Sequence, residues 1–178
     1  LFSLITLAVL MGTQIRRPRL LLKYAKWAYF ISVVFVFFIA AYQTIQQYRI
    51  WQASGLFVKY SDWGLVWTAW QYGFTNFFLN ALIAFAISAL GWLGLRFLNR
   101  RAEERFFEKP EPYLFAVGLF LSGHPGWIIY ALLVFGLSIL IATIKFIFTR
   151  RRDVIFSFYY VWLPAAIGVI IYLSATSR

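Results

Sequence analysis

The sequence contains no cysteine and only one histidine, His124. Disulfides, thiolate metal sites and cysteine nucleophiles are therefore excluded within this chain, and a single histidine cannot build a multi-histidine metal or haem site. Acidic residues are also scarce, with six Asp and Glu among 178 residues, and none lies in the middle of a long apolar segment. Because carboxylates inside apolar helices usually mark proton and ion pathways, a pump or ion-coupled transporter is disfavoured. We expect no metal and no other cofactor.

Apolar residues, in contrast, are in excess. They make up 62% of the chain, and aromatic residues alone make up 22%. Soluble domains are about 45–50% apolar, and a chain of this length cannot bury the surplus in a core of its own. Lipid must therefore solvate much of the surface, and the sequence predicts an all-α polytopic membrane protein.

Six apolar segments predict about six transmembrane helices that form one domain over residues 1–178. The segments are 1–12, 20–45, 75–98, 113–121, 127–148 and 154–174. A helix needs about 20 residues to cross a bilayer. The first segment is therefore expected to be the end of a helix whose upstream residues are missing. The segment 113–121 is expected either to count as a crossing or to form a short buried or re-entrant helix.

The segment between the second and third apolar stretches is rich in tryptophan. Trp63, Trp67 and Trp70 follow one another at i, i+4 and i+7, on one face of a helix. Tryptophan is favoured where the bilayer meets water. We therefore expect an interfacial helix near residues 61–73, with this face as a membrane anchor.

The net charge of +11 is distributed unevenly between the apolar segments. Five Lys and Arg residues lie in 13–26, two in 46–73, five in 96–112, none in 122–126 and four in 145–153. Short basic loops of a membrane protein face the cytoplasm. The alternation predicts that 13–26, 96–112 and 145–153 are cytoplasmic, in a membrane of the bacterial inner (plasma) membrane type. Nucleic-acid binding is disfavoured, because these charges occupy short loops between apolar segments.

Small and polar residues recur along two of the predicted helices. In a bilayer, such residues usually face another helix, because they allow close approach of the backbones and hydrogen bonds across the contact. The helix-packing candidates are Asn76, Asn80, Ala84, Ser88, Ser138 and Ala142.

The loop before residue 113 mixes charges of both signs, with Glu103, Glu104, Glu108 and Glu111 among basic residues. Two interpretations stay open: a solvated loop held by salt bridges, or a site in which Glu111 performs acid–base chemistry or binds a cation. Anionic lipids attract basic segments next to the membrane. The candidates for contact with lipid head groups are Arg100, Arg101 and Arg105. His124 lies in a Gly-Pro turn and is expected to be structural.

The second half of the chain runs PYLFAVGLFLSGHPGWIIYALLVFGLSIL, then the basic TRRRD, then FSFYYVWLP. Over about residues 106–173, this order resembles the C-terminal membrane half of type IV prepilin leader peptidases. That family has a basic loop, a short helix ending at a glycine turn, a long helix, a second basic loop, and a last helix that opens with Phe and Pro.

The resemblance does not extend to the catalytic residues. Leader peptidases are aspartyl enzymes that use two aspartates on the cytoplasmic side. At the corresponding places this chain has Met11 to Gln14 before Pro18, and Lys109 to Pro112 before Gly118. A lone Glu111 cannot replace a pair of carboxyl groups that share one proton. The resemblance therefore implies a degenerate member without that activity.

Three functions stay open. The first is a structural or accessory subunit of a membrane complex, with other membrane subunits and the lipid bilayer as partners. The second is a leader-peptidase-like or lipid-processing enzyme that uses Glu111. The third is a lipid-binding membrane protein whose cytoplasmic loops meet anionic lipids.

Overall fold

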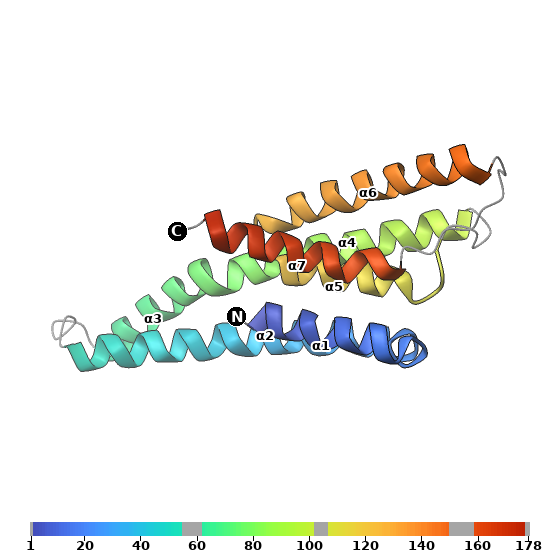
Figure 1. Cartoon of the computed structure of the whole chain (residues 1–178). Helices are drawn as coiled ribbons and strands as arrows, with labels where there is room; N and C mark the ends of the chain where they lie inside the picture. Colours follow the sequence, from blue (N-terminus) through green and yellow to red (C-terminus); the bar gives the residue numbers. More distant parts are fainter. Residues whose placement is uncertain (1, 55–61, 102–106, 150–158, 177–178) are drawn as a thin grey trace.

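The computed structural model describes residues 2–54, 62–101, 107–149 and 159–176, and their regular structure is entirely helical (Figure 1). This confirms the predicted all-α class for the described part of the chain. In chain order, the elements are α1 (Phe2–Arg16), α2 (Pro18–Ser54), α3 (Asp62–Gly73), the π-helix η1 (Phe74–Phe78), α4 (Leu79–Arg101), α5 (Glu111–Ser122), α6 (Gly126–Thr149) and α7 (Tyr159–Thr176).

In the described part of the chain, three helical stretches are long and apolar enough to cross a membrane, which is compatible with the predicted membrane protein. They are Pro18–Ser54, the continuous stretch Trp63–Arg101, and Tyr159–Thr176. The predicted six crossings are not established by this criterion. α5 has 12 residues, which correspond to about 18 Å of helix, well short of the ~30 Å hydrocarbon layer. α1 is also shorter than a full crossing, with 15 residues.

The stretch from α3 to α4 differs from the sequence-based expectation in its boundaries. A helix over 61–73 was expected to end before a separate helix began at Thr75, but α3 passes through η1 into α4 without a loop. Gly73 keeps right-handed helical angles, with φ −61° and ψ −42°, instead of ending the helix. Its missing side chain also lets α3 approach α2, because a Cβ at this position would overlap the side chain of Thr44.

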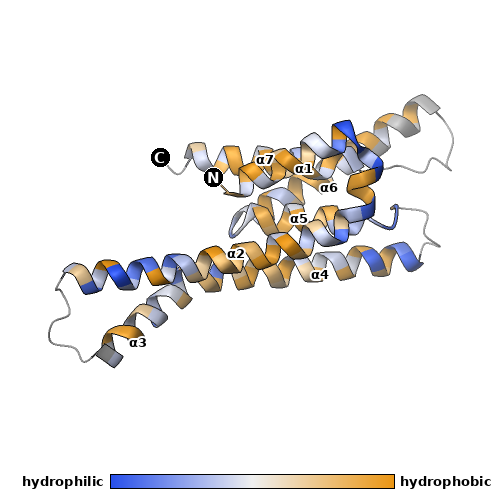
Figure 2. Cartoon of the chain, turned by 90° about the horizontal axis from the view of Figure 1, so that it is seen from below, coloured by the Kyte–Doolittle hydropathy of each residue, from blue (hydrophilic) through white to orange (hydrophobic). Residues whose placement is uncertain are grey.

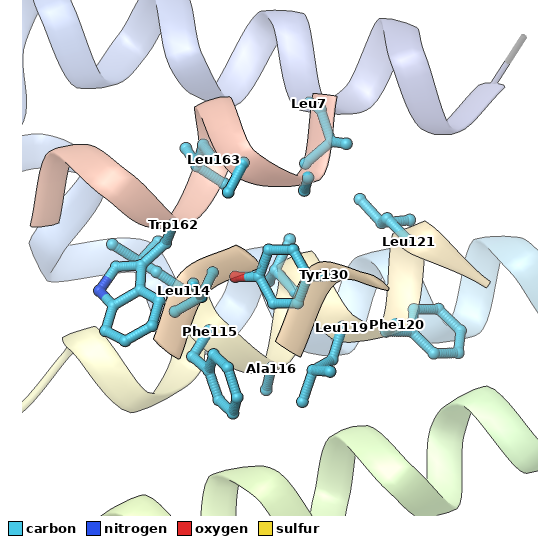
Figure 3. Close-up of a cluster of buried hydrophobic side chains, with 14 of the residues drawn as sticks. Leu7, Leu114, Phe115, Ala116, Leu119, Phe120, Leu121, Tyr130, Trp162 and Leu163 are labelled. Atoms are coloured by element: carbon cyan, nitrogen blue, oxygen red, sulfur yellow. The ribbon is translucent and has the colours of Figure 1, made fainter. Parts of the chain in front are cut away.

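α5 forms the centre of the bundle. It packs against α1, α2, α4, α6 and α7, and all of its residues except Tyr113 are buried. Figure 3 shows Leu7 of α1 and Leu163 of α7 on one side of α5, with Phe115 and Leu119 of α5 pointing toward α4. The segment 113–121, expected either to count as a crossing or to form a short buried or re-entrant helix, is thus a short buried helix.

The helices share one common end. The corner between α1 and α2, the end of α4, the start of α5, the end of α6 and the start of α7 all lie there (Figure 1). Both termini and the turn between α5 and α6 lie part-way along α2 and α4. The hairpin formed by the C-terminal part of α2 and by α3 therefore extends past the rest of the bundle. Figure 2 shows hydrophilic residues concentrated at the common end and along the projecting part of α2.

Candidate functional site

The corner between α4 and α5 is closed by one side chain, that of Asn99. Asn99 is buried near the end of α4. Its Nδ2 donates to the carbonyl oxygen of Phe107 at 2.8 Å, and the Phe107 backbone N–H donates to Asn99 Oδ1 at 3.0 Å. An amide side chain offers both a donor and an acceptor, so Asn99 pairs with Phe107 as a second backbone would. This pairing returns the chain to the bundle and sets the start of α5.

Glu111 is the first residue of α5 and is completely buried. Pro110 and Pro112 flank it, and prolines are tolerated there because the first N–H groups of a helix have no partner within the helix. The positive end of the helix dipole favours a carboxylate at this position. Of the other carboxylates in this predicted loop, Glu108 is exposed, and Glu103 and Glu104 lie outside the described residues. Glu111 therefore lies inside the bundle, apart from the exposed Glu108.

Beside the start of α5 lies a pocket of about 290 Å³, which we call the corner pocket. Its wall contains two aromatic rings, those of Trp92 and Tyr113, with their centroids 5.5 Å apart. The guanidinium carbon of Arg96 lies 5.4 Å from the centre of the Trp92 ring. The residues that line the corner pocket are Trp92, Arg96, Asn99, Arg100, Lys109, Pro112 and Tyr113. Three positive side chains, from α4 and from the loop before α5, thus surround one small pocket.

The three arginines predicted to meet lipid head groups have different positions. Arg100 lines the corner pocket. Arg101 does not line it, and its guanidinium carbon lies 4.7 Å from the centre of the Phe97 ring. Arg105 lies outside the described residues. Arg96 was not singled out from the sequence, although Trp92, Arg96 and Arg100 at i, i+4 and i+8 share one helix face and could have indicated it.

A second polar cluster joins α7 to the corner between α1 and α2. Gln14 is buried, and its side-chain Nε2 donates to the backbone carbonyl of Tyr159. The hydroxyl of Tyr159 donates in turn to the carbonyl of Pro18 at 3.2 Å. Gln14 belongs to the segment where the leader-peptidase pattern would place its first aspartate. In this chain its side chain links two helices.

The helix-packing candidates on α4 separate into two groups. Ala84 and Ser88 are buried, and the hydroxyl oxygen of Ser88 lies 2.9 Å from that of Tyr29 on α2, in hydrogen-bond contact. Asn76 and Asn80 are exposed, and each side chain bonds to a carbonyl four residues earlier in the same helix.

The other two helix-packing candidates lie on α6. Ser138 is half-buried and donates to the carbonyl of Val134 at 2.7 Å, within the same helix. The side chain of Ala142 lies outside the described part. The structure therefore brings the two buried candidates, Ala84 and Ser88, to a contact with other helices.

His124 lies exposed in the turn between α5 and α6. Gly123 has φ +65°, a conformation that glycine adopts without strain. The indole N–H of Trp127 lies 3.4 Å from His124 Nδ1 and donates to it. This contact ties the ring to the first turn of α6.

The projecting hairpin carries the two most exposed tryptophans of the described chain, Trp63 with 84% exposed and Trp67 with 61%. Trp70 of the same hairpin is 49% exposed. Trp51 of α2 and Tyr72 of α3 face each other with ring centroids 5.2 Å apart. Together with Trp67, Trp70 and Phe74 they line an open groove of about 660 Å³, which we call the hairpin groove.

Asn99→Ala is expected to lower the free energy of unfolding by about 1–2 kcal/mol, since it removes two hydrogen bonds from a buried corner. Unfolding in detergent, followed by circular dichroism, measures this loss. Asn80→Ala is the matched control: the same change on the same helix, but at an exposed side chain that bonds only within its helix. Equal effects of the two substitutions would show that Asn99 does not hold the corner.

Comparisons with models of known protein families, with curated proteins and with solved structures find no match to this chain. The resemblance to leader peptidases therefore stays a prediction from the residues alone.

Proposed function

We propose that this protein is a non-catalytic structural subunit of a membrane protein complex, and that the α2–α3 hairpin is the part that binds its partner. The observation that carries the proposal is the exposure of Trp63 and Trp67 on a hairpin that extends past the rest of the bundle. These rings lie too far from the apolar part of the bundle to contact the head-group region of a bilayer, as the lengths of the helices indicate.

Helix lengths give an estimate of that distance. In α2, the apolar segment ends at Ile45, and Gln46–Ser54 adds about 14 Å of helix at ~1.5 Å per residue. In the return arm, Trp63 precedes Thr75 of η1, where the next apolar segment begins, by about 18 Å on the same rise. The head-group region extends only about 5–8 Å beyond the hydrocarbon layer.

A tryptophan anchor requires contact with that narrow region. α3 continues from α4 through η1 and turns away from its line (Figure 2), and we infer that a hairpin of this length carries Trp63 beyond the lipid. Aromatic side chains are enriched at protein interfaces, where they bury a large area at a low entropic cost. A partner with an apolar surface is therefore the best explanation for these rings.

The proposed topology follows from the common end of the bundle. The ends of α1, α4 and α6 carry the basic loops, so we infer that this end is cytoplasmic and that the membrane is of the bacterial inner-membrane type. In this topology the chain enters the membrane from the cytoplasmic end in α5. It turns before it reaches the non-cytoplasmic surface and returns to the cytoplasmic end in α6. The hairpin faces the opposite, non-cytoplasmic side.

The buried polar residues support a non-catalytic role. Gln14 is bonded to the backbone of α7, and Glu111 is enclosed by the helices around α5. Acid catalysis by a pair of carboxyl groups needs both of them near the substrate. Both sites at which a leader-peptidase-like enzyme would hold its acids are instead involved in helix packing.

The test is purification of the full chain from its native membrane in mild detergent, with mass spectrometry of the proteins that come with it. We expect stoichiometric partners to be retained by the wild type and lost from the double variant Trp63→Ser/Trp67→Ser, because hot-spot aromatic side chains contribute about 2 kcal/mol or more each to an interface. Trp27→Ser is the matched control. Trp27 is 60% exposed, but it lies near the start of α2, at the end of this helix that is remote from the hairpin.

Placement of a photo-crosslinking residue at position 63 or position 27 gives an independent measurement. Protein adducts at 63 and lipid adducts at 27 are the expected result. Lipid adducts at both positions, from a protein that purifies alone, would contradict the proposal and favour the membrane-anchor interpretation of α3.

A further inference from the structure

Three positive side chains line the corner pocket, and none of the described residues in its wall is a carboxylate. Arg96 and Arg100 follow each other at i and i+4 on α4, and Lys109 belongs to the loop before α5. Like charges at this helical spacing repel. Glu111, although next to Pro112 in sequence, does not line the pocket. An anion in the pocket would therefore reduce the repulsion between Arg96 and Arg100.

We propose that the corner pocket binds the phosphate group of an anionic ligand, either a phospholipid head group or a soluble phosphate ester. The inference is independent of whether the protein works with a partner at its hairpin. It concerns the opposite end of α4 from η1 and involves none of the hairpin tryptophans.

The chemistry of the side chains favours phosphate over other anions. Guanidinium groups present a planar fork of donors that matches two phosphate oxygens at once, and an ammonium group adds a point charge. The Arg96 guanidinium carbon lies 5.4 Å from the centre of the Trp92 ring, and this cation–π contact holds the side chain at the pocket wall. A phosphate in the pocket would therefore meet an arginine that is already held there.

The size and place of the pocket narrow the ligand further. Its volume of about 290 Å³ lies at the lower limit of the ~300–1,000 Å³ usual for small-molecule sites, so it suits a head group but not an acyl chain. The residues that line the pocket belong to α4 and to the segment around the start of α5, and the end of α4 and the start of α5 lie at the common end of the bundle (Figure 1). Trp92 and Tyr113 in its wall are residue types that favour the head-group level of a bilayer. A phospholipid phosphate is the source that this place makes most accessible.

The test measures binding of two probes to the purified full chain in detergent. The probes are phosphatidylglycerol, with phosphatidylcholine as the zwitterionic comparison, and inorganic phosphate. Native mass spectrometry and the ligand-induced shift of the unfolding midpoint report the affinity. Arg96→Gln and Arg100→Gln each remove one charge from the pocket. Arg101→Gln is the matched control, because it removes the same charge from the same helix end but from a side chain outside the pocket.

We expect phosphatidylglycerol to bind each pocket variant at least about tenfold more weakly than it binds the wild type. This is the usual scale for the loss of one charge-assisted contact. The Arg101→Gln variant is expected to stay within about twofold of the wild type, since its side chain does not line the pocket and a distant exposed charge contributes little. Arg100→Lys keeps the charge but loses the planar fork, so it should give an intermediate affinity. All three positions are exposed, and an unchanged elution volume confirms that each of the four variants is folded.

Inorganic phosphate provides the second comparison. If it also binds more weakly to the pocket variants than to the wild type and to Arg101→Gln, the result supports a phosphate site, with a soluble phosphate ester as the natural ligand. Equal losses in the Arg100→Gln and Arg101→Gln variants would overturn the proposal in favour of diffuse surface electrostatics. Binding of neither probe to the wild type would overturn it as well.

Discussion

Gly118→Ala is expected to destabilise this protein by about 3 kcal/mol, at the upper end of the cost of overpacking a core. Gly118 lies in the middle of α5, directly beneath the ring of Tyr130 on α6, and a Cβ at this position would overlap the Tyr130 hydroxyl and ring. Tyr130 cannot move aside, because it is completely buried and its ring lies 5.7 Å from that of Phe115. Thermal unfolding of the variant in detergent measures the effect.

Two further variants separate this clash from a general effect of alanine. Gly136→Ala lies on α6, where a Cβ meets nothing within 4 Å, so it should be neutral or stabilising by up to about 1 kcal/mol through helix propensity. Tyr130→Leu removes the ring that clashes. The double variant Gly118→Ala/Tyr130→Leu should therefore lose less stability than the two single variants lose together. Additive costs, or a Gly118→Ala variant as stable as Gly136→Ala, would show that α5 and α6 do not approach as closely as described.

Hydropathy predicts the membrane class of this chain but does not distinguish lipid from protein as the surroundings of a helix. α5 and α6 are both apolar in sequence. α5 is buried on every side, whereas Leu132, Phe135 and Ile139 of α6 are exposed. An apolar side chain gains about as much from a protein interior as from lipid, because lipid tails are as apolar as leucine. The central position of α5 therefore could not be derived from its composition.

Long-range polar contacts were also beyond sequence analysis. Gln14 and Tyr159 are 145 positions apart, and no local pattern relates them. Glu111 was predicted to belong to a charged loop, because its neighbours in the sequence are charged. In the structure it is buried, because the pairing of Asn99 with Phe107 brings residue 111 into the bundle. Most of the predicted basic loop 13–26 is helical, since α1 ends at Arg16 and α2 begins at Pro18. The ends of α1 and α4, in contrast, were predictable, because Arg16 and Arg100 lie in their last turns.

Phe115 links α5 to its neighbours through aromatic contacts. Its ring lies 5.1 Å from that of Trp162 on α7 and 6.4 Å from that of Phe135 on α6, in edge-to-face arrangements, in addition to the contact with Tyr130 (Figure 3). On the side of α4, a Cβ on Gly91 would come within 3.0 Å of the Phe115 ring. Phe115 thus fills the space among three helices, and no neighbouring side chain in this close-packed region can replace it without repacking.

Phe115→Ala is accordingly expected to cost about 2–4 kcal/mol, somewhat less than the ~3–5 kcal/mol of a soluble core, because part of that cost is transfer from water, which a bilayer does not require. Phe135→Ala is the matched control. Phe135 belongs to the same aromatic cluster, but it is 54% exposed, so lipid or detergent can fill the space left by its ring. We expect a cost of less than about 1 kcal/mol for this control, the scale of one aromatic pair. Unfolding of both variants in the same detergent compares the two costs directly. Equal costs would mean that α5 is not the packed centre of the bundle, and the enclosure of Glu111 would then lose its main support.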